Sequence, residues 1–281
     1  MTGTVEKVRS RIRRLVPEAR FFVKGFDLAD AVQCRRCRRN LGLAFPIPPK
    51  RLRTQVGPDT RVEGFLEQGK RTAGEIRDIL RGAGRTLESF ERILDFGCGC
   101  GRQMRWLADL PQSCRLYGSD VFAPAIRWNQ RHLRFAEFAV NGFHPPLPYE
   151  AEKFDLIFAI SVFTHFNEPD QLAWVEELHR VAAPGATLLP STHGEFALDA
   201  LRKGKVPLSD EFLARLNRLG DLSQEGFLFE PYVPGSNYGL AFHDIGYIRE
   251  HWGRKFRILK FIPRGQDGWQ DVVVLEKERR A

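Results

Sequence analysis

In the middle of the chain, short continuous apolar runs alternate with segments whose apolar residues recur at helical spacing. This alternation of strand and helix patterns predicts an α/β fold. Short, nearly continuous apolar runs have the length and composition of buried strands. These runs cover residues 92–96, 115–120, 138–140, 154–160 and 186–189. The segments between them carry apolar residues at helical spacing at 102–110, 124–134 and 168–182. Such alternation builds βαβ units, so we expect a doubly wound, mostly parallel sheet.

The C-terminal pattern differs from the rest. Residues 256–262 and 271–276 predict two further strands, and the loop 263–270 between them is too short for a helical crossover. They must therefore pair antiparallel. The prediction is a seven-stranded sheet that ends in an antiparallel hairpin.

Segments outside this pattern suggest an extension and an insertion. Residues 4–16 predict a helix that ends at Pro17, and residues 62–81 predict a second helix that is broken or bent around Gly69 and Gly74. The prolines of 43–49 require extended backbone there. We therefore expect a mainly helical extension over 1–88, a core domain over 89–281, and an insertion over 195–253.

A glycine-rich turn follows the first predicted strand. Gly97, Gly99 and Gly101 stand at alternate positions, and apolar residues return at helical spacing after them. Glycine is needed where the backbone takes a positive φ or lies against a ligand. Open α/β sheets bind nucleotides at such turns. From the turn alone, a loop without a ligand and a nicotinamide site remain open.

The spacing from Asp95 to Gly101 is D-x-G-x-G-x-G, which is not the G-x-G-x-x-G of dinucleotide sites. It resembles the first motif of the class I S-adenosylmethionine-dependent methyltransferases. Segments 154–157, 161–166 and 178–185 resemble later motifs, so the resemblance covers about residues 90–277. It implies a Rossmann-like methyltransferase fold, whose C-terminal antiparallel hairpin dinucleotide dehydrogenases generally lack, and S-adenosylmethionine as the cofactor.

The resemblance also implies roles for single residues. Asp120 would hold the two ribose hydroxyls, Val121 and Phe122 would pack on adenine, and Asn141 would lie near the adenine amino group. Asp120 is equally suited to cap a helix, and Asn141 to form a turn. The full set of expected cofactor-binding residues is Asp95, Gly97, Cys98, Gly99, Gly101, Asp120, Val121, Phe122, Asn141, Gly142, Ile160 and Ser161.

Two further elements could reach the cofactor. Arg102 either binds a carboxylate or is a solvated side chain, and we expect residues 65–71 to close over the cofactor, as N-terminal helices often do in this family.

Methyl transfer requires an aligned nucleophile, and a base only where the acceptor must lose a proton. His165 and His193 follow the fourth and fifth strands, at the edge where ligands bind, and are the candidate catalytic residues. Each could equally order a loop or the core. The aromatic insertion suggests an acceptor pocket with Tyr232, Tyr238 and His243, although these side chains could simply pack it on the sheet.

Composition narrows the class of protein. The 281 residues are 43% hydrophobic and 28% charged, as in a soluble globular protein. No apolar run is long enough to span a membrane, and residues 1–10 lack a signal-peptide core, so we expect a cytoplasmic protein. Cys34 and Cys37 are half of a zinc-ribbon pattern, and we expect no metal site. The sequence does not indicate an oligomeric state.

The net charge of +8 is concentrated in residues 1–53, which carry +10. Such a basic segment can bind along phosphate backbones or anionic surfaces, or it can be a solvated helix face without a partner. We favour a methyltransferase acting on a small-molecule acceptor at O, N or activated C, such as an aromatic compound or a natural-product intermediate. A methyltransferase for a macromolecule or a sugar-linked carrier is the alternative, and a non-catalytic cofactor- or nucleic-acid-binding module is weaker. No Asn/Asp-Pro-Pro-Tyr/Phe motif follows the fourth strand, so nucleic acid is not the expected partner.

Overall fold

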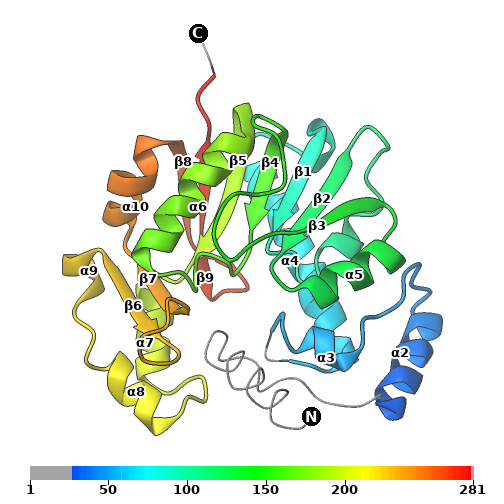
Figure 1. The fold of residues 1–281 in the computed structure, drawn as a ribbon, viewed down its shortest axis with the longest axis horizontal. Helices are drawn as coiled ribbons and strands as arrows, with labels where there is room; N and C mark the ends of the chain where they lie inside the picture. Colours follow the sequence, from blue (N-terminus) through cyan, green and yellow to red (C-terminus); the bar gives the residue numbers. More distant parts are fainter. Residues whose placement is uncertain (1–26, 58, 280–281) are drawn as a thin grey trace, which may run out of the picture.

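A computed structural model describes residues 27–57 and 59–279 of the chain (Figure 1). Its main sheet has seven strands in the order β3-β2-β1-β4-β5-β9-β8. The strands are β1 (Arg92–Phe96), β2 (Arg115–Asp120), β3 (Ala136–Val140), β4 (Phe154–Ala159), β5 (Ala182–Thr192), β8 (Arg257–Gln266) and β9 (Gln270–Glu276). The first five are parallel, and β9 lies antiparallel to both β5 and β8. The predicted fold class is confirmed.

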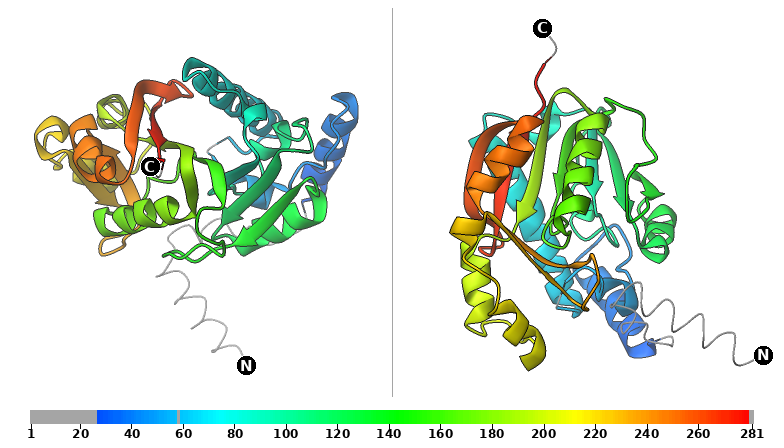
Figure 2. Two further views of the ribbon diagram at one scale, coloured as in Figure 1. Left: turned by 90° about the horizontal axis from the view of Figure 1, so that it is seen from above. Right: turned by 60° about the vertical axis from the view of Figure 1, so that its left-hand side comes forward.

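Helices cover both faces of this sheet (Figures 1 and 2). Leu94 and Phe96 point to the face covered by α6 (Glu168–Val181), and Ile93 to the face covered by α4 (Val62–Gly82). Outside residues 195–243, the other described helices are α2 (Leu28–Asn40), α3 (Lys50–Arg53), η2 (Leu87–Ser89), η3 (Met104–Trp106), α5 (Ala123–His132), α10 (Ile245–His251) and η4 (Trp252–Arg254). Burial on both faces explains why the parallel strands read as continuous apolar runs.

Two predicted helices differ from the structure. The helix expected over 102–110 is only the 3₁₀ turn η3, because side chains three residues apart, such as Met104 and Leu107, are buried equally well by a 3₁₀ turn. The α4 helix is unbroken over 62–82. A Cβ at Gly69 would lie 2.3 Å from the Arg102 carbonyl oxygen, so this glycine allows close packing where we predicted a break.

Helices α2 and α3 of the extension and helices α7 to α9 of the insertion (residues 195–225) lie at the end of the sheet where the parallel strands end, on opposite sides of it (Figure 1). The helix predicted over 4–16 lies outside the described residues, while 43–49 is free of helix as predicted. The insertion has its own apolar core. It begins with α7 (Glu195–Arg202), α8 (Asp210–Leu216) and α9 (Leu222–Glu225), continues with a hairpin of β6 (Phe227–Pro231) and β7 (Gly239–His243), and ends with α10 and the start of η4.

Single bridges join this hairpin to the segments that follow β4 and β5. Phe166 pairs with Tyr238, and His193 with Phe242. The insertion is thus fixed at the carboxyl ends of the central strands. None of the helices within 27–57 and 59–279 is long and apolar enough to cross a membrane.

Candidate functional site

The glycine turn after β1 requires all three of its glycines. Gly97, Gly99 and Gly101 have φ angles of 80°, 51° and 73°. A Cβ at Gly97 would lie 2.4 Å from Val162, and one at Gly99 would lie 2.2 Å from Val56. The turn is therefore tightly enclosed by the segment after β4 and by the N-terminal extension.

Asp120 at the end of β2 is bonded to this turn. Its Oδ2 accepts a hydrogen bond from the Gly99 amide at 2.8 Å, and its Oδ1 accepts one from the Phe122 amide at 2.7 Å. Burial raises the pKa of this carboxyl. Each carboxylate oxygen keeps a second lone pair that can accept from a diol. Phe122 is the N-cap of α5 and its side chain makes no capping bond.

Asp95 lies in β1, two residues before the first glycine of the turn, and is fully buried. Its Oδ1 accepts a hydrogen bond from Gln103 Nε2 at 3.1 Å, whereas its Oδ2 has no partner among the described residues. Burial raises the pKa of this carboxyl well above its usual range. Arg102 is also buried, with 7% of its surface exposed, so of the two alternatives that the sequence left open for it, the solvated side chain is wrong.

Asn141 and Ser161 complete the carboxyl edge of the sheet. Buried Asn141 donates from Nδ2 to the Gly142 carbonyl, and its Oδ1 has no donor within the described part of the chain. Ser161 has a φ of 59°, and its amide donates to Ser191 Oγ at 2.8 Å. Gln270 contacts both serine hydroxyls. Sequence reasoning did not assign Ser191 or Gln270 to the site, although Ser191 follows the predicted strand 186–189 by two positions.

The remaining residues expected to bind the cofactor lie in or next to the turn, and they differ in how far they are exposed to solvent. Val121 is 51% exposed and Ile160 is 6% exposed. Cys98 is buried under the turn, where burial raises the pKa of its thiol. The structure therefore brings the twelve residues to one edge, and their roles stay predictions.

His165 lies against the insertion hairpin. Its Nδ1 is 2.9 Å from the Gly239 carbonyl oxygen and 3.0 Å from the Tyr232 hydroxyl, and its ring lies 5.2 Å from that of Tyr238. A carbonyl can only accept, so Nδ1 carries the proton and Nε2 keeps its lone pair. Burial lowers the pKa of this histidine. His165, Tyr232 and Tyr238 are thus brought together.

His193 and His243 lie deeper. Burial lowers the pKa of each to about 3. The Nε2 of His243 is 2.7 Å from Gln171 Oε1, and both imidazoles are at most 6% exposed. They are neutral interior groups in the free protein, and their predicted catalytic and substrate-binding roles stay predictions.

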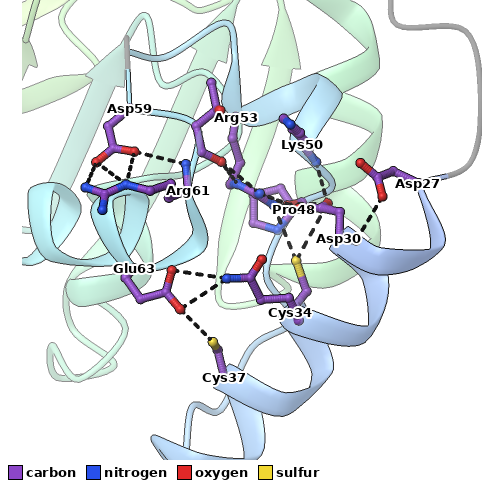
Figure 3. A network of polar contacts seen from close by, with 12 residues as sticks. Asp27, Asp30, Cys34, Cys37, Pro48, Lys50, Arg53, Asp59, Arg61 and Glu63 are labelled. Carbon is purple, nitrogen blue, oxygen red and sulfur yellow. Dashed lines mark hydrogen bonds and ion pairs between the residues drawn. The ribbon is translucent and has the colours of Figure 1, made fainter.

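A buried polar network holds the N-terminal extension against the turn (Figure 3). Arg53 is 1% exposed, pairs with Asp30 at 2.5 Å, and donates to the carbonyls of Pro48 and Thr60. Asp30 also accepts from the Lys50 amide. This network holds Arg53 and Thr60, which flank Val56 in the sequence, and the Val56 side chain lies against Gly99.

Cys34 contacts this network, and Cys37 makes a separate hydrogen bond beside it (Figure 3). Cys34 lies 3.3 Å from Arg53 Nη1, and burial raises the pKa of its thiol to about 11. Cys37 donates to Glu63. In the part of the chain that the structure describes, no group of three or more His, Cys, Asp or Glu side chains could hold a metal ion.

Comparison with known proteins gives a family match and distant relatives. Residues 93–185 match the family model described as "Methyltransferase domain". The methyltransferase GfsG of Streptomyces halstedii is 27% identical over 47% of this chain and 46% of its own length. The chloroplastic tocopherol O-methyltransferase of Arabidopsis thaliana is 27% identical over 57% of this chain and 48% of its own length. The matched part thus spans about half the length of both relatives.

A solved structure supports the fold. The magnesium protoporphyrin IX methyltransferase of Synechocystis PCC 6803, solved with bound SAH, superposes with a TM-score of 0.51. The two chains are 17% identical, and the match covers 79% of this chain and 90% of the other. The order and directions of the seven strands are therefore those of the Rossmann-like methyltransferase fold.

Proposed function

We propose that this chain, which carries a class I S-adenosylmethionine-dependent methyltransferase domain, transfers the methyl group of S-adenosylmethionine to a small-molecule acceptor. The observation that carries the proposal is the glycine turn with Asp120 bonded to its central amide. The turn lies where β1 stands between β2 and β4, the point at which the strand order reverses. Ligands of open α/β sheets bind at this point.

The residues around the turn fit this cofactor. Asp120 would accept hydrogen bonds from the ribose hydroxyls, and Asn141 Oδ1 can accept from the adenine amino group. Half-exposed Val121 and partly buried Phe122 would cover the adenine face. When bound, the cofactor supplies a sulfonium-activated methyl group.

The acceptor would bind between this edge and the insertion hairpin. Tyr232 and Tyr238 bring aromatic rings close to His165, and Phe143 lies against Tyr238, which suits a planar acceptor. His165 Nε2 would take the proton of a hydroxyl or amine acceptor, because the Gly239 carbonyl holds the ring in the tautomer that leaves Nε2 unprotonated. The tocopherol methyltransferase relative is consistent with a small aromatic acceptor.

Turnover of labelled S-adenosylmethionine against a panel of phenols, amines and enolisable carbonyl compounds tests this proposal. With an acceptor found, His165→Gln should lower kcat about 100- to 10,000-fold without changing the affinity for S-adenosylhomocysteine. His179→Gln is the matched control, since His179 is a partly buried histidine at the far end of α6, against Phe256. Unchanged kcat in His165→Gln would remove this residue from the chemistry.

The second candidate is a methyltransferase for a macromolecule or a sugar-linked carrier. Exposed arginines on α2 favour it, namely Arg35, Arg36, Arg38 and Arg39. Charge reversal at Arg35 and Arg36 should then raise KM for the carrier in a manner that salt suppresses. A KM that does not respond to these charges would exclude this use of the helix.

A further inference from the structure

Helix α2 turns apolar side chains away from the protein. Leu28 and Val32 are 66% and 56% exposed, and Leu41 at the C-cap of the helix is 60% exposed. Among residues 27–57 and 59–279, no other large hydrophobic side chain is as exposed as these three. A surface helix normally directs its apolar stripe at the core. Leu28 and Val32 instead lie one turn apart on the outside of α2, where they line a shallow, mostly apolar depression.

The inner face of α2 is polar and fixes this orientation (Figure 3). The buried residues of the helix are Asp30 and Cys34. Asp30 pairs with Arg53 at 2.5 Å, and Cys37 donates to Glu63 on α4. Turning the apolar side chains inward would break both contacts and leave Arg53 buried without its carboxylate, which is costly. Specific polar contacts therefore hold the apolar side of α2 outward.

Arginines continue the exposed stripe along the helix. Arg35, Arg36 and Arg39 follow Leu28 and Val32 at helical spacing, and all three are exposed. None of them pairs with an acid in the described part of the chain. Residues 31–57 contain seven Lys or Arg and no Asp or Glu. These five side chains, which we call the outer face of α2, thus form a stripe that is apolar at its start and cationic at its end.

Charge indicates what could cover the outer face of α2. Residues 1–26, which run directly into this helix, carry seven Lys or Arg against two Glu, a net charge of +5, and would be repelled by it. A nucleic acid offers phosphates but no apolar layer. An anionic bilayer offers both, because arginines reach its headgroups while apolar side chains enter the boundary below them. The apolar residues predicted on the helix 4–16 also alternate with Lys and Arg, so the same pattern precedes α2 in the sequence.

We propose that the outer face of α2 binds an anionic lipid membrane surface. Leu28 and Val32 enter the boundary between headgroups and acyl chains, and Arg35, Arg36 and Arg39 contact lipid phosphates and carboxylates. The helix stands at the outer rim of the described chain, so a flat surface can reach it (Figures 1 and 2). This inference goes beyond the proposed function and does not depend on a bound cofactor.

Co-sedimentation of the full chain with lipid vesicles tests the inference. One set of vesicles is phosphatidylcholine alone, and the other is equal parts of phosphatidylcholine and phosphatidylserine. Wild-type protein should bind the mixed vesicles at least about 10-fold more tightly than the neutral ones. Added sodium chloride should weaken that binding, because it screens the arginines from the anionic headgroups.

Replacing the arginines tests their part in binding. Arg35→Gln/Arg36→Gln/Arg39→Gln should weaken binding to the mixed vesicles about 10- to 100-fold. Arg38 stays unchanged, because it donates to the carbonyls of Leu43 and Ala44. The matched control has the same net charge and should bind within about threefold of wild type. It replaces three exposed arginines on other elements, R131Q/R134Q/R249Q.

Replacing the apolar side chains tests insertion without changing the charge. Leu28→Gln/Val32→Gln should weaken binding to the mixed vesicles about 10-fold. Its control is Val233→Gln/Leu259→Gln, because these side chains are 45% and 37% exposed and lie outside α2. All the replaced side chains are exposed, so the variants should keep the wild-type midpoint of urea unfolding. If the arginine variant does not fold, the apolar pair and its control decide the matter.

Three results would overturn the inference. Equal binding by the α2 variants and their controls would mean that overall charge, and not this helix, attracts the vesicles. Wild-type protein that binds neither kind of vesicle, as expected if residues 1–26 or a second copy cover the helix, would exclude a membrane. Binding to polyuridylate or polyglutamate without binding to vesicles would favour a macromolecular partner instead.

Discussion

Gly99→Ala tests how the N-terminal extension closes over the glycine turn. Gly99 has a φ of 51°, which costs a residue with a Cβ about 1–2 kcal/mol. The new Cβ would also lie 2.2 Å from Val56 Cγ1, and relieving such overpacking costs roughly 1–3 kcal/mol. The free energy of unfolding should therefore fall by about 2–5 kcal/mol, the sum of these two costs.

The cost of the contact with Val56 can be removed by a second substitution, so it can be measured separately from the backbone cost. Val56→Ala deletes the atom that the new Cβ would meet, so Gly99→Ala/Val56→Ala should be more stable than the sum of the single changes by roughly 1–3 kcal/mol. Urea unfolding followed by tryptophan fluorescence gives all four values. Gly84→Ala is the control, because Gly84 has a φ of 73° and a Cβ added there would meet no atom within 4 Å, so it carries only the backbone cost. Additivity within about 0.5 kcal/mol would refute the packing of residue 56 on the turn.

Three further predictions concern buried titratable groups. Asp30→Ala leaves Arg53 without its buried carboxylate and should lower the free energy of unfolding by about 3–5 kcal/mol; a loss below about 1 kcal/mol in urea would contradict this. The folded pKa values of His193 and His243, about 3, lie below the ordinary 6.5. The unfolded chain therefore binds protons first, and stability that is complete above pH 6.5 should decline towards pH 3 by about 1.4 kcal/mol per pH unit for each histidine. His243→Gln should flatten that decline, and an unchanged slope would count against it. Because burial also lowers the pKa of His165, kcat for a protic acceptor should stay constant down to pH 6.5 and fall only below it, whereas a fall above pH 6.5 would contradict the assigned base.

Local patterns located the seven strands of the main sheet and the glycine turn. They did not give the full length of β5 and β8, which extend beyond the predicted runs 186–189 and 256–262, and they did not predict β6 and β7. β1 and β2 begin and end where their apolar runs do, because strands buried on both faces tolerate few polar residues. Connection lengths then determined which strands are parallel. The predicted helix after Gly101 was wrong because 3₁₀ and α turns share a three-residue spacing. The predicted break in α4 was wrong because glycine also serves close helix packing.

Long-range contacts could not be predicted. Gln68 reaches Arg102 across 34 positions, and Gln270 reaches Ser161 across 109. Sequence patterns place His165 at a strand edge, but only the fold shows that the Gly239 carbonyl, 74 positions away, holds one of its ring nitrogens. The arrangement of side chains in the site therefore depends on long-range contacts that the local hydrophobic pattern does not predict.

The most direct test is titration of S-adenosylhomocysteine into ligand-free protein by calorimetry, with wild type and Asp120→Ala compared. If Asp120 holds the ribose, the wild type should bind with a Kd in the micromolar range, on the order of −8 kcal/mol. Asp120→Ala should weaken binding about 100-fold, and a pyridine dinucleotide should give no heat. Heat from the dinucleotide and none from S-adenosylhomocysteine would contradict the assignment of the glycine turn.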